Sequence, residues 1–139
     1  MSLQPPLKVF TVEDANRLLP AVRARLIELR ATHREILALE TKVDIEEMTG
    51  GGVGGTPSAP TVARMEEINE TIRVRIETYR EQVEEFATLG CELKDLEQGL
   101  VDFYARLNGQ LVYLCWREGE DEIRFWHPLE GGFGAREPL

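Results

Sequence analysis

The sequence predicts an α+β fold: a long, coiled-coil-like antiparallel two-helix hairpin followed by a small C-terminal antiparallel β-sheet of three to four strands. Apolar residues recur at steps of three and four through most of the first ninety residues. From residue 100 the pattern changes to alternation with a period of two. Between two alternating runs lies Asn108-Gly109, the strongest short signal for a β-hairpin. A chain of 139 residues is expected to form a single domain, 1–139.

Residues 10–48 are predicted to form a kinked helix. Thr11 is the expected N-cap, and two carboxylates follow in the first turn, where they favour the positive helix end. Pro20 removes a backbone donor, which predicts a short helix over 12–18 and then a kink or break. Beyond it the apolar stripe comprises Val22, Leu26, Leu29, His33, Ile36 and Val43.

The glycine-rich segment 49–60 is predicted to be a flexible hairpin tip. It lacks the Gly-Lys-Ser/Thr ending of a phosphate-binding loop and follows no strand. A second helix is expected over 61–89, ended by Leu89-Gly90. Its stripe at three- and four-residue spacing comprises Val62, Met65, Asn69, Ile72, Ile76, Tyr79, Val83 and Phe86.

Antiparallel pairing of the two helices brings their polar stripe residues, His33 and Asn69, within about one turn of each other. These two residues are interpreted either as a hydrogen-bonded pair that fixes the register or as a buried ligand site. Two helices alone leave much of each apolar stripe exposed. A homodimer through the helical hairpin is therefore expected.

Composition excludes several classes of partner. The net charge is −9, and the last fifty residues carry 5 basic against 10 acidic groups. Nucleic acids and anionic membranes both require basic surfaces, so neither is an expected partner. No apolar run is long enough for a signal or a membrane span. Cys91 and Cys115 lack C-x-x-C spacing and are expected to be free thiols, which favours the cytoplasm; no cofactor is expected.

Residues 90–139 are predicted to form the sheet and a C-terminal loop, with strands over 100–106, 111–117 and 122–127 and a fourth over 91–95. The two-residue turn fixes Asp102 opposite Cys115. The next turn is expected to place Arg124 opposite Cys115 as well. The resulting apolar face comprises Val101, Phe103, Ala105, Val112, Leu114, Trp116, Ile123 and Phe125.

The opposite face mixes aromatic residues with a carboxylate and a guanidinium, which is typical of a binding surface. The alternative interpretation is a solvated face with cross-strand pairs. The candidate contact residues are Asp102, Tyr104, Tyr113, Arg124 and Trp126.

A different candidate site groups Asp95, Asp102, Cys115 and His127 for metal binding or acid–base chemistry. Their spacing matches no common metal-ligand pattern, and alternation predicts His127 on the face opposite Asp102. A mid-strand thiol beside Trp116 is more typical of packing than of nucleophilic catalysis. Phe133 between glycines predicts an anchored loop, and Arg136 is either an anion contact or a surface arginine.

Several segments of the chain resemble one prokaryotic family, catalogued as domain of unknown function 2203. The resemblance implies one domain with a distinctive C-terminal part and implies no activity; at Tyr104 the chain departs from the family pattern, which has proline. The segments that carry it are Phe10–Pro20, Lys94–Phe103, Val112–Arg117, Trp126-His127, Gly132-Phe133 and Arg136.

These observations favour a small cytosolic, non-enzymatic binding protein that contacts an unknown protein or small molecule through the sheet face. The alternative is a small metal-dependent or acid–base enzyme that uses the second group of residues. A third hypothesis is a purely structural oligomerisation module.

Overall fold

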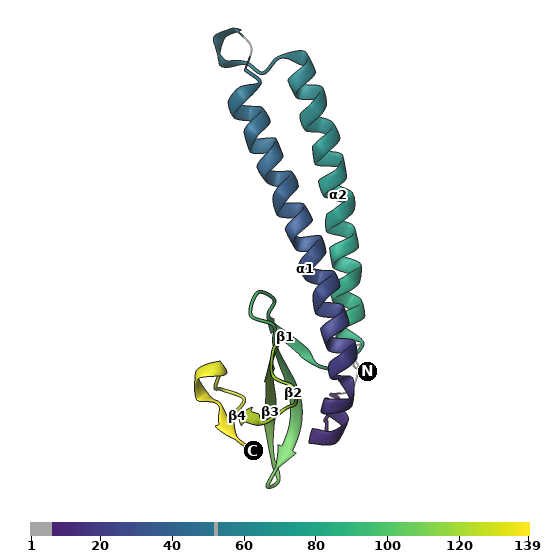
Figure 1. Cartoon of the computed structure of the whole chain (residues 1–139), viewed down its shortest axis with the longest axis vertical. Helices are drawn as coiled ribbons and strands as arrows, with labels where there is room; N and C mark the ends of the chain where they lie inside the picture. Colours follow the sequence, from purple (N-terminus) through teal and green to yellow (C-terminus); the bar gives the residue numbers. More distant parts are fainter. Residues whose placement is uncertain (1–6, 52) are drawn as a thin grey trace, which may run out of the picture. The chain divides into compact units, whose positions relative to one another are not determined.

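The computed structural model describes residues 7–51 and 53–139 (Figure 1). Two long helices pack together and a five-stranded antiparallel sheet follows, which confirms the α+β prediction and adds one strand to it. None of the described helices has an apolar stretch long enough to cross a membrane. The elements are α1 Val12–Thr49, η1 Val53–Gly55, α2 Ala59–Ala87, β1 Glu92–Asp95, β2 Leu100–Leu107, β3 Gln110–Arg117, β4 Phe125–His127, η2 Phe133–Ala135 and β5 Glu137–Pro138.

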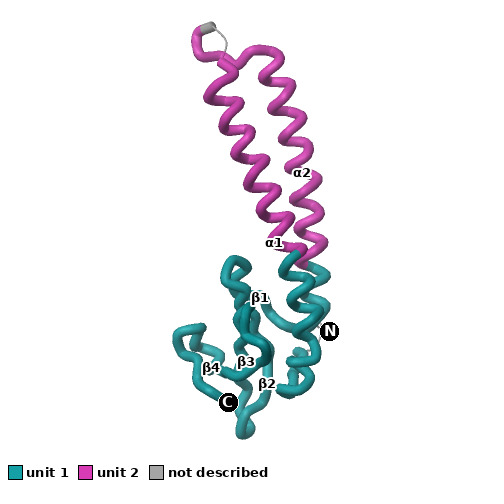
Figure 2. The backbone as a smooth tube through the Cα atoms, viewed as in Figure 1, with its two compact units in different colours: residues 1–27, 84–139 teal, residues 28–83 magenta. Residues whose placement is uncertain are grey.

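The chain divides into two compact units (Figure 2). Unit 1 combines the described residues up to Ile27 with Glu84–Leu139, and unit 2 is Glu28–Val83. Unit 1 therefore contains the sheet together with the first part of α1 and the last turn of α2. Unit 2 contains the remaining helical residues and the tip.

Helix α1 runs without a break through Pro20, so the predicted short helix over 12–18 is wrong. Thr11 is the N-cap as predicted, since its Oγ1 accepts the Asp14 N–H at 3.0 Å. A proline inside a helix costs about 3 kcal/mol. Leu19 and Val22, on either side of it, are both buried, and burial of such side chains stabilises by about 1.5–3 kcal/mol each. Burial along α1 therefore outweighs the cost of the proline.

Within unit 2, half of the predicted α2 stripe faces α1. Met65, Ile72 and Tyr79 are partly buried, but Asn69 is exposed. The predicted His33–Asn69 contact is therefore wrong, and the His33 ring lies instead 6.1 Å from the ring of Tyr79. The inward face of α2 is completed by residues outside the predicted stripe, namely Ile68 and Arg75.

The reversal between β2 and β3 has the predicted form. Asn108 and Gly109 both adopt positive φ, at 51° and 81°, as a two-residue type I′ turn requires. The register follows, with Asp102 opposite Cys115. The predicted apolar face of these two strands is confirmed, since its six residues are all buried: Val101, Phe103, Ala105, Val112, Leu114 and Trp116.

The register of β4 differs by one residue from the prediction. Cys115 pairs with Phe125, where Arg124 was expected, and Tyr113 pairs with His127. The connection after β3 is not a simple turn: the Trp116 indole donates to Glu120 O at 2.9 Å. Because side chains alternate along a strand, this one-residue slip reverses which face each β4 residue occupies.

The apolar face of the sheet packs on the helical part of unit 1. The rings of Phe10 and Phe103 meet edge to face at 5.3 Å, and Phe10 N–H donates to Tyr104 O at 2.7 Å. In the loop before β4, buried Ile123 donates its N–H to Asn16 Oδ1 of α1 at 2.7 Å. The candidate site lies on the other face of the sheet, which these contacts do not cover.

Candidate functional site

The second face of the sheet, here called the polar face, carries a group of titratable side chains from four neighbouring strands. Its members are set by the strand registers, which pair Glu92 with Asp102, Tyr104 with Tyr113 and Cys115 with Phe125. The polar face comprises Glu92, Asp102, Tyr104, Tyr113, Cys115, Phe125 and His127.

Asp102, Cys115 and His127 form a buried cluster at the centre of this face. Each offers one ligand atom, and the three atoms lie within 4.8 Å of one another. Exposed fractions are 3% for Asp102 and 2% for both Cys115 and His127. The prediction that His127 lies on the opposite face from Asp102 is therefore wrong, because the β4 register moves it across.

His127 is held by two hydrogen bonds. Nδ1 lies 2.7 Å from Pro128 O, and Nε2 lies 3.0 Å from Asp102 Oδ2. A carbonyl oxygen only accepts, so Nδ1 carries a proton and donates it. The contact between Nε2 and the carboxylate then requires one further proton, held either as a carboxyl group on Asp102 or as an imidazolium on His127.

Burial shapes the electrostatics of the cluster. It raises the pKa of Asp102, although the charge of His127 and hydrogen bonds from Cys115 and His127 act in the opposite direction. Asp102 Oδ1 is buried and has no hydrogen-bond partner among the described residues. Burial, followed by the charge of Asp102, raises the pKa of the Cys115 thiol to about 12. Cys115 is therefore a protonated thiol at neutral pH, which argues against a nucleophilic role.

A hydrogen-bonded group lies beside the cluster. The Tyr113 hydroxyl donates to Tyr104 Oη at 2.9 Å. The centre of the Tyr113 ring lies 5.3 Å from the centre of the His127 ring. Lys94 Nζ donates to Glu92 at 2.5 Å and lies 4.7 Å from the Tyr113 ring. Burial has the largest single effect on the pKa of Lys94 and lowers it, but the hydrogen bond to Glu92 and the negative charges of Glu92, Asp102 and Tyr104 together raise the pKa.

Residues after β4 cover the cluster. A cavity of about 200 Å³ lies between them and the polar face. Arg136 holds this segment in place, because its Nη2 donates to Cys115 O at 3.2 Å and to Glu120 Oε1 at 2.7 Å. The predicted anchored loop is thus present, but Arg136 is its anchor, while Phe133, from which the loop was predicted, is 38% exposed. The cavity is lined by Lys94, Leu100, Asp102, Tyr113, Cys115, His127, Leu129, Gly131, Gly132 and Phe133.

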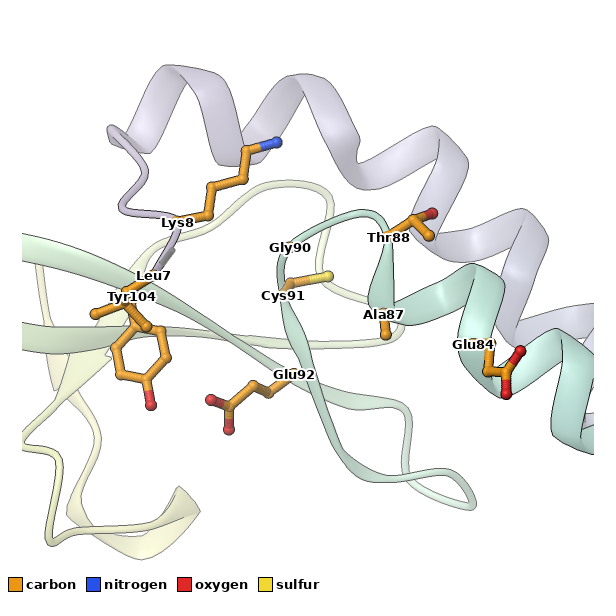
Figure 3. A pocket seen from close by; sticks show the side chains of 9 residues that line it. All are labelled: Leu7, Lys8, Glu84, Ala87, Thr88, Gly90, Cys91, Glu92 and Tyr104. Carbon is orange, nitrogen blue, oxygen red and sulfur yellow. The ribbon is translucent and has the colours of Figure 1, made fainter. Parts of the chain in front are cut away.

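Glu92 and Tyr104 open onto a different and larger cavity of about 550 Å³ (Figure 3). Figure 3 shows the Tyr104 ring and the Glu92 carboxylate reaching the same part of this cavity, while the Cys91 sulfur points away from them. Burial raises the pKa of the Cys91 thiol to about 12. The cavity therefore contains no activated nucleophile among its described residues.

Three predicted site residues lie away from the cluster, namely Asp95, Arg124 and Trp126. Asp95 accepts the Gln98 N–H at 3.0 Å and stabilises the turn after β1. Arg124 is exposed and pairs with Asp121 and Glu122, at 3.4 and 3.2 Å.

Trp126 pairs with Leu114 and so belongs to the apolar face. Of the five predicted contact residues, Asp102, Tyr104 and Tyr113 thus share the polar face, whereas Arg124 and Trp126 do not. Phe125, expected on the apolar face, takes the place opposite Cys115 that was expected for Arg124.

Lys94 and Glu92 were not predicted as members of the site. Alternation along the predicted strand 91–95 could have suggested that they share a face, although the register of β1 shifts between Leu93 and Asp95. No comparable signal indicated that Leu129 and Phe133 cover the cluster, because apolar residues do not recur at a regular spacing in their segment.

No curated protein and no solved structure matches this chain. One family model does, with the description "Uncharacterized conserved protein (DUF2203)", and it covers residues 8–139. Since the match includes nearly the whole chain, the protein belongs to this family.

Proposed function

We propose that this protein binds a divalent transition-metal ion, with zinc as the best fit, through Asp102, Cys115 and His127. The observation that carries the proposal is the convergence of three ligand atoms within 4.8 Å at a buried point of the sheet. A donor set of one carboxylate oxygen, one thiol and one imidazole suits zinc. Calcium and magnesium prefer sites made of oxygen atoms alone.

The spacing of the donor atoms is close to what zinc needs. Typical zinc–ligand bonds of about 2.0–2.3 Å place tetrahedral ligand atoms about 3.3–3.8 Å apart. Asp102 Oδ2 and His127 Nε2 start 3.0 Å apart, and no pair exceeds 4.8 Å. Side-chain movements of about 1 Å or less would therefore complete the geometry.

The orientation of His127 supports the same proposal. Metal-binding histidines usually donate their second ring N–H to a carbonyl or carboxylate, which fixes the ring and the tautomer. His127 Nδ1 makes this contact with Pro128 O at 2.7 Å. The ligand atom Nε2 is thereby directed toward Asp102 and Cys115.

An ion would also satisfy groups that are otherwise costly to bury. A buried polar atom without a hydrogen bond costs about 1–3 kcal/mol, and Asp102 Oδ1 is such an atom. A cation beside this carboxylate would offset that cost. A cation would replace the proton shared by Asp102 and His127 and the proton on Cys115. Three protein ligands leave a tetrahedral ion with one open position, the arrangement typical of zinc that exchanges ligands.

The test is zinc titration of chelator-treated protein against a competing indicator dye. We expect one ion per chain, and H127A, C115S and D102N should each weaken binding by roughly 100-fold or more. The chain offers matched controls, because it has two histidines and two cysteines. H33A and C91S should bind zinc as the unchanged protein does, and so should D95N.

Circular dichroism of each variant separates loss of the ion from loss of the fold. Substoichiometric zinc in the unchanged protein would overturn the proposal. Equal affinity in H127A and H33A would overturn it as well, because the ion would then lie elsewhere.

A further inference from the structure

Resting on the proposed metal site, we infer that the open position of the ion takes a small monocarboxylate. One carboxylate oxygen would bind the ion and the other would accept from Lys94. The apolar part of the ligand would lie against Leu129 and Phe133. Three properties of the cavity beside the cluster support this ligand: its volume, the side chains that line it and its charge.

The cavity limits the ligand to a small molecule. Its volume of about 200 Å³ is below the range of roughly 300–1,000 Å³ found for most ligand pockets. Asp102, Cys115 and His127 all contribute to its lining, so a ligand inside it can reach an ion bound to them. The segment after β4, which covers the sheet, bounds the cavity on the side opposite the strands.

The walls are mainly apolar. Leu100, Leu129 and Phe133 supply side chains, and Gly131 and Gly132 supply backbone without side chains. A Cβ at Gly131 would lie 2.8 Å from Ala135 Cβ, whereas a Cβ at Gly132 would meet no atom within 4 Å. Such walls suit an alkyl or aryl group better than a second polar group.

Among the described residues, the cavity lining contains one lysine, Lys94, and no arginine. An ammonium carries three donors, and Glu92 accepts from it at 2.5 Å, which leaves donors for a ligand. Lys94 Nζ lies 4.7 Å from the centre of the Tyr113 ring, which itself lies 5.3 Å from the His127 ring of the cluster. An anionic ligand could therefore bridge the ion and Lys94.

The charges of the site favour a monoanion over a dianion. The Asp102 carboxylate and the Cys115 thiolate would neutralise a divalent ion, and Glu92 neutralises Lys94, so a monoanion adds a single negative charge, which lies beside the Lys94 ammonium. A dianion such as phosphate would add two negative charges to a partly buried site, which is costly. A neutral carbonyl group could accept from Lys94 but would gain less from its positive charge.

The experiment compares three probes on zinc-loaded protein by calorimetry: benzoate, its neutral analogue benzamide, and inorganic phosphate. Benzoate should bind at least tenfold more tightly than either of the others. K94M should weaken benzoate binding at least tenfold while the protein still binds one zinc ion per chain. K94R should retain most of the benzoate affinity, and K42M, at an exposed position of α1, should have no effect.

Each outcome decides one question. If zinc binds but benzoate does not, or if K94M binds benzoate normally, the carboxylate inference fails and the metal site stands. If zinc-free protein binds benzoate equally well, the role of the ion in recognition is refuted. If zinc itself fails to bind, the proposed function fails and this inference falls with it.

Discussion

His127 Nε2 lies 3.0 Å from Asp102 Oδ2, across a separation of 25 residues in the sequence. The contact exists because β4 pairs with β3 so that Tyr113 faces His127, and because Tyr113 and Asp102 belong to the same face of the sheet. His127 Nδ1 donates its own proton to Pro128 O. When no cation is bound, the contact between Nε2 and the Asp102 carboxylate therefore holds one further proton.

Metal binding should therefore release protons. One comes from the Asp102–His127 pair and one from Cys115, whose pKa of about 12 keeps the thiol protonated at neutral pH. Calorimetry at pH 7 in buffers of different ionisation enthalpy should report about two protons per zinc ion. C115S should reduce the number to about one. Release unchanged in C115S would contradict the assignment of Cys115 as a ligand.

The buried thiols predict loss of stability in alkaline solution. Burial raises the pKa of Cys91 and of Cys115 from an ordinary 9.0 to about 12. A group whose pKa is higher in the folded state contributes stability that is complete below the unfolded pKa and is lost as pH rises through the folded pKa. For metal-free protein, urea midpoints should fall between pH 9 and 12. The double variant C91A/C115A should show a smaller fall, and an identical slope would refute this cause.

Arg136 should stabilise unit 1 far more than Arg124 does. Its ion pair with Glu120 is largely buried, with side-chain exposures of 12% and 23%, and its guanidinium lies 4.1 Å from the Phe125 ring. Removing one partner of a buried pair is expected to cost about 2–4 kcal/mol, against less than about 1 kcal/mol for an exposed pair. Urea unfolding of R136M and R124M measures the difference. Equal effects would show that the Arg136 contact is weak.

The turn between β2 and β3 should require glycine at position 109 for backbone reasons alone. Gly109 has φ of 81°, and a Cβ there would meet no atom within 4 Å. G109A should therefore cost about 1 kcal/mol of unfolding free energy from strain at positive φ. G134A is the control, because Gly134 has neither a close neighbour nor positive φ. A cost as large in G134A would point to another cause.

The helical hairpin is expected to form a homodimer. Val62, Ile76 and Val83 are 40–43% exposed and lie at multiples of seven residues, so they form one row on α2 that is interrupted by the exposed Asn69. A second copy would bury this row. Sedimentation equilibrium at micromolar concentration should give a dimer, and I76E should give a monomer. V74E, which lies off the row, should remain dimeric; a monomeric unchanged protein would rule out the dimer.

The parts of the fold that depend on local rules could be predicted from the sequence. The Asn108-Gly109 turn leaves one choice of register, so Asp102 was placed correctly beside Cys115. The β4 register could not be predicted, because its connection is anchored by contacts distant in sequence. Ile123 N–H bonds to Asn16, 107 residues earlier. A slip of one residue there separated Arg124 and Trp126 from the site and brought in His127.

Helix continuity was mispredicted for a related reason. Local propensity disfavours Pro20 inside a helix, but burial of Leu19 and Val22 depends on what packs against them. Asn69 was misplaced because an apolar repeat identifies two adjacent columns of a helix, of which one faces α1 and the other does not. Long-range packing decided both cases.

Unit 1 is assembled from the two ends of the chain, so synthesis and folding cannot proceed in the same order there. Phe10 meets Phe103, which the ribosome adds more than ninety residues later. The residues that pair within the α1–α2 hairpin are all synthesised before β2. They also lie closer together in the sequence, so their contacts form faster. A nascent chain stalled before β2 should therefore expose Phe10 to chaperones until Phe103 has been added.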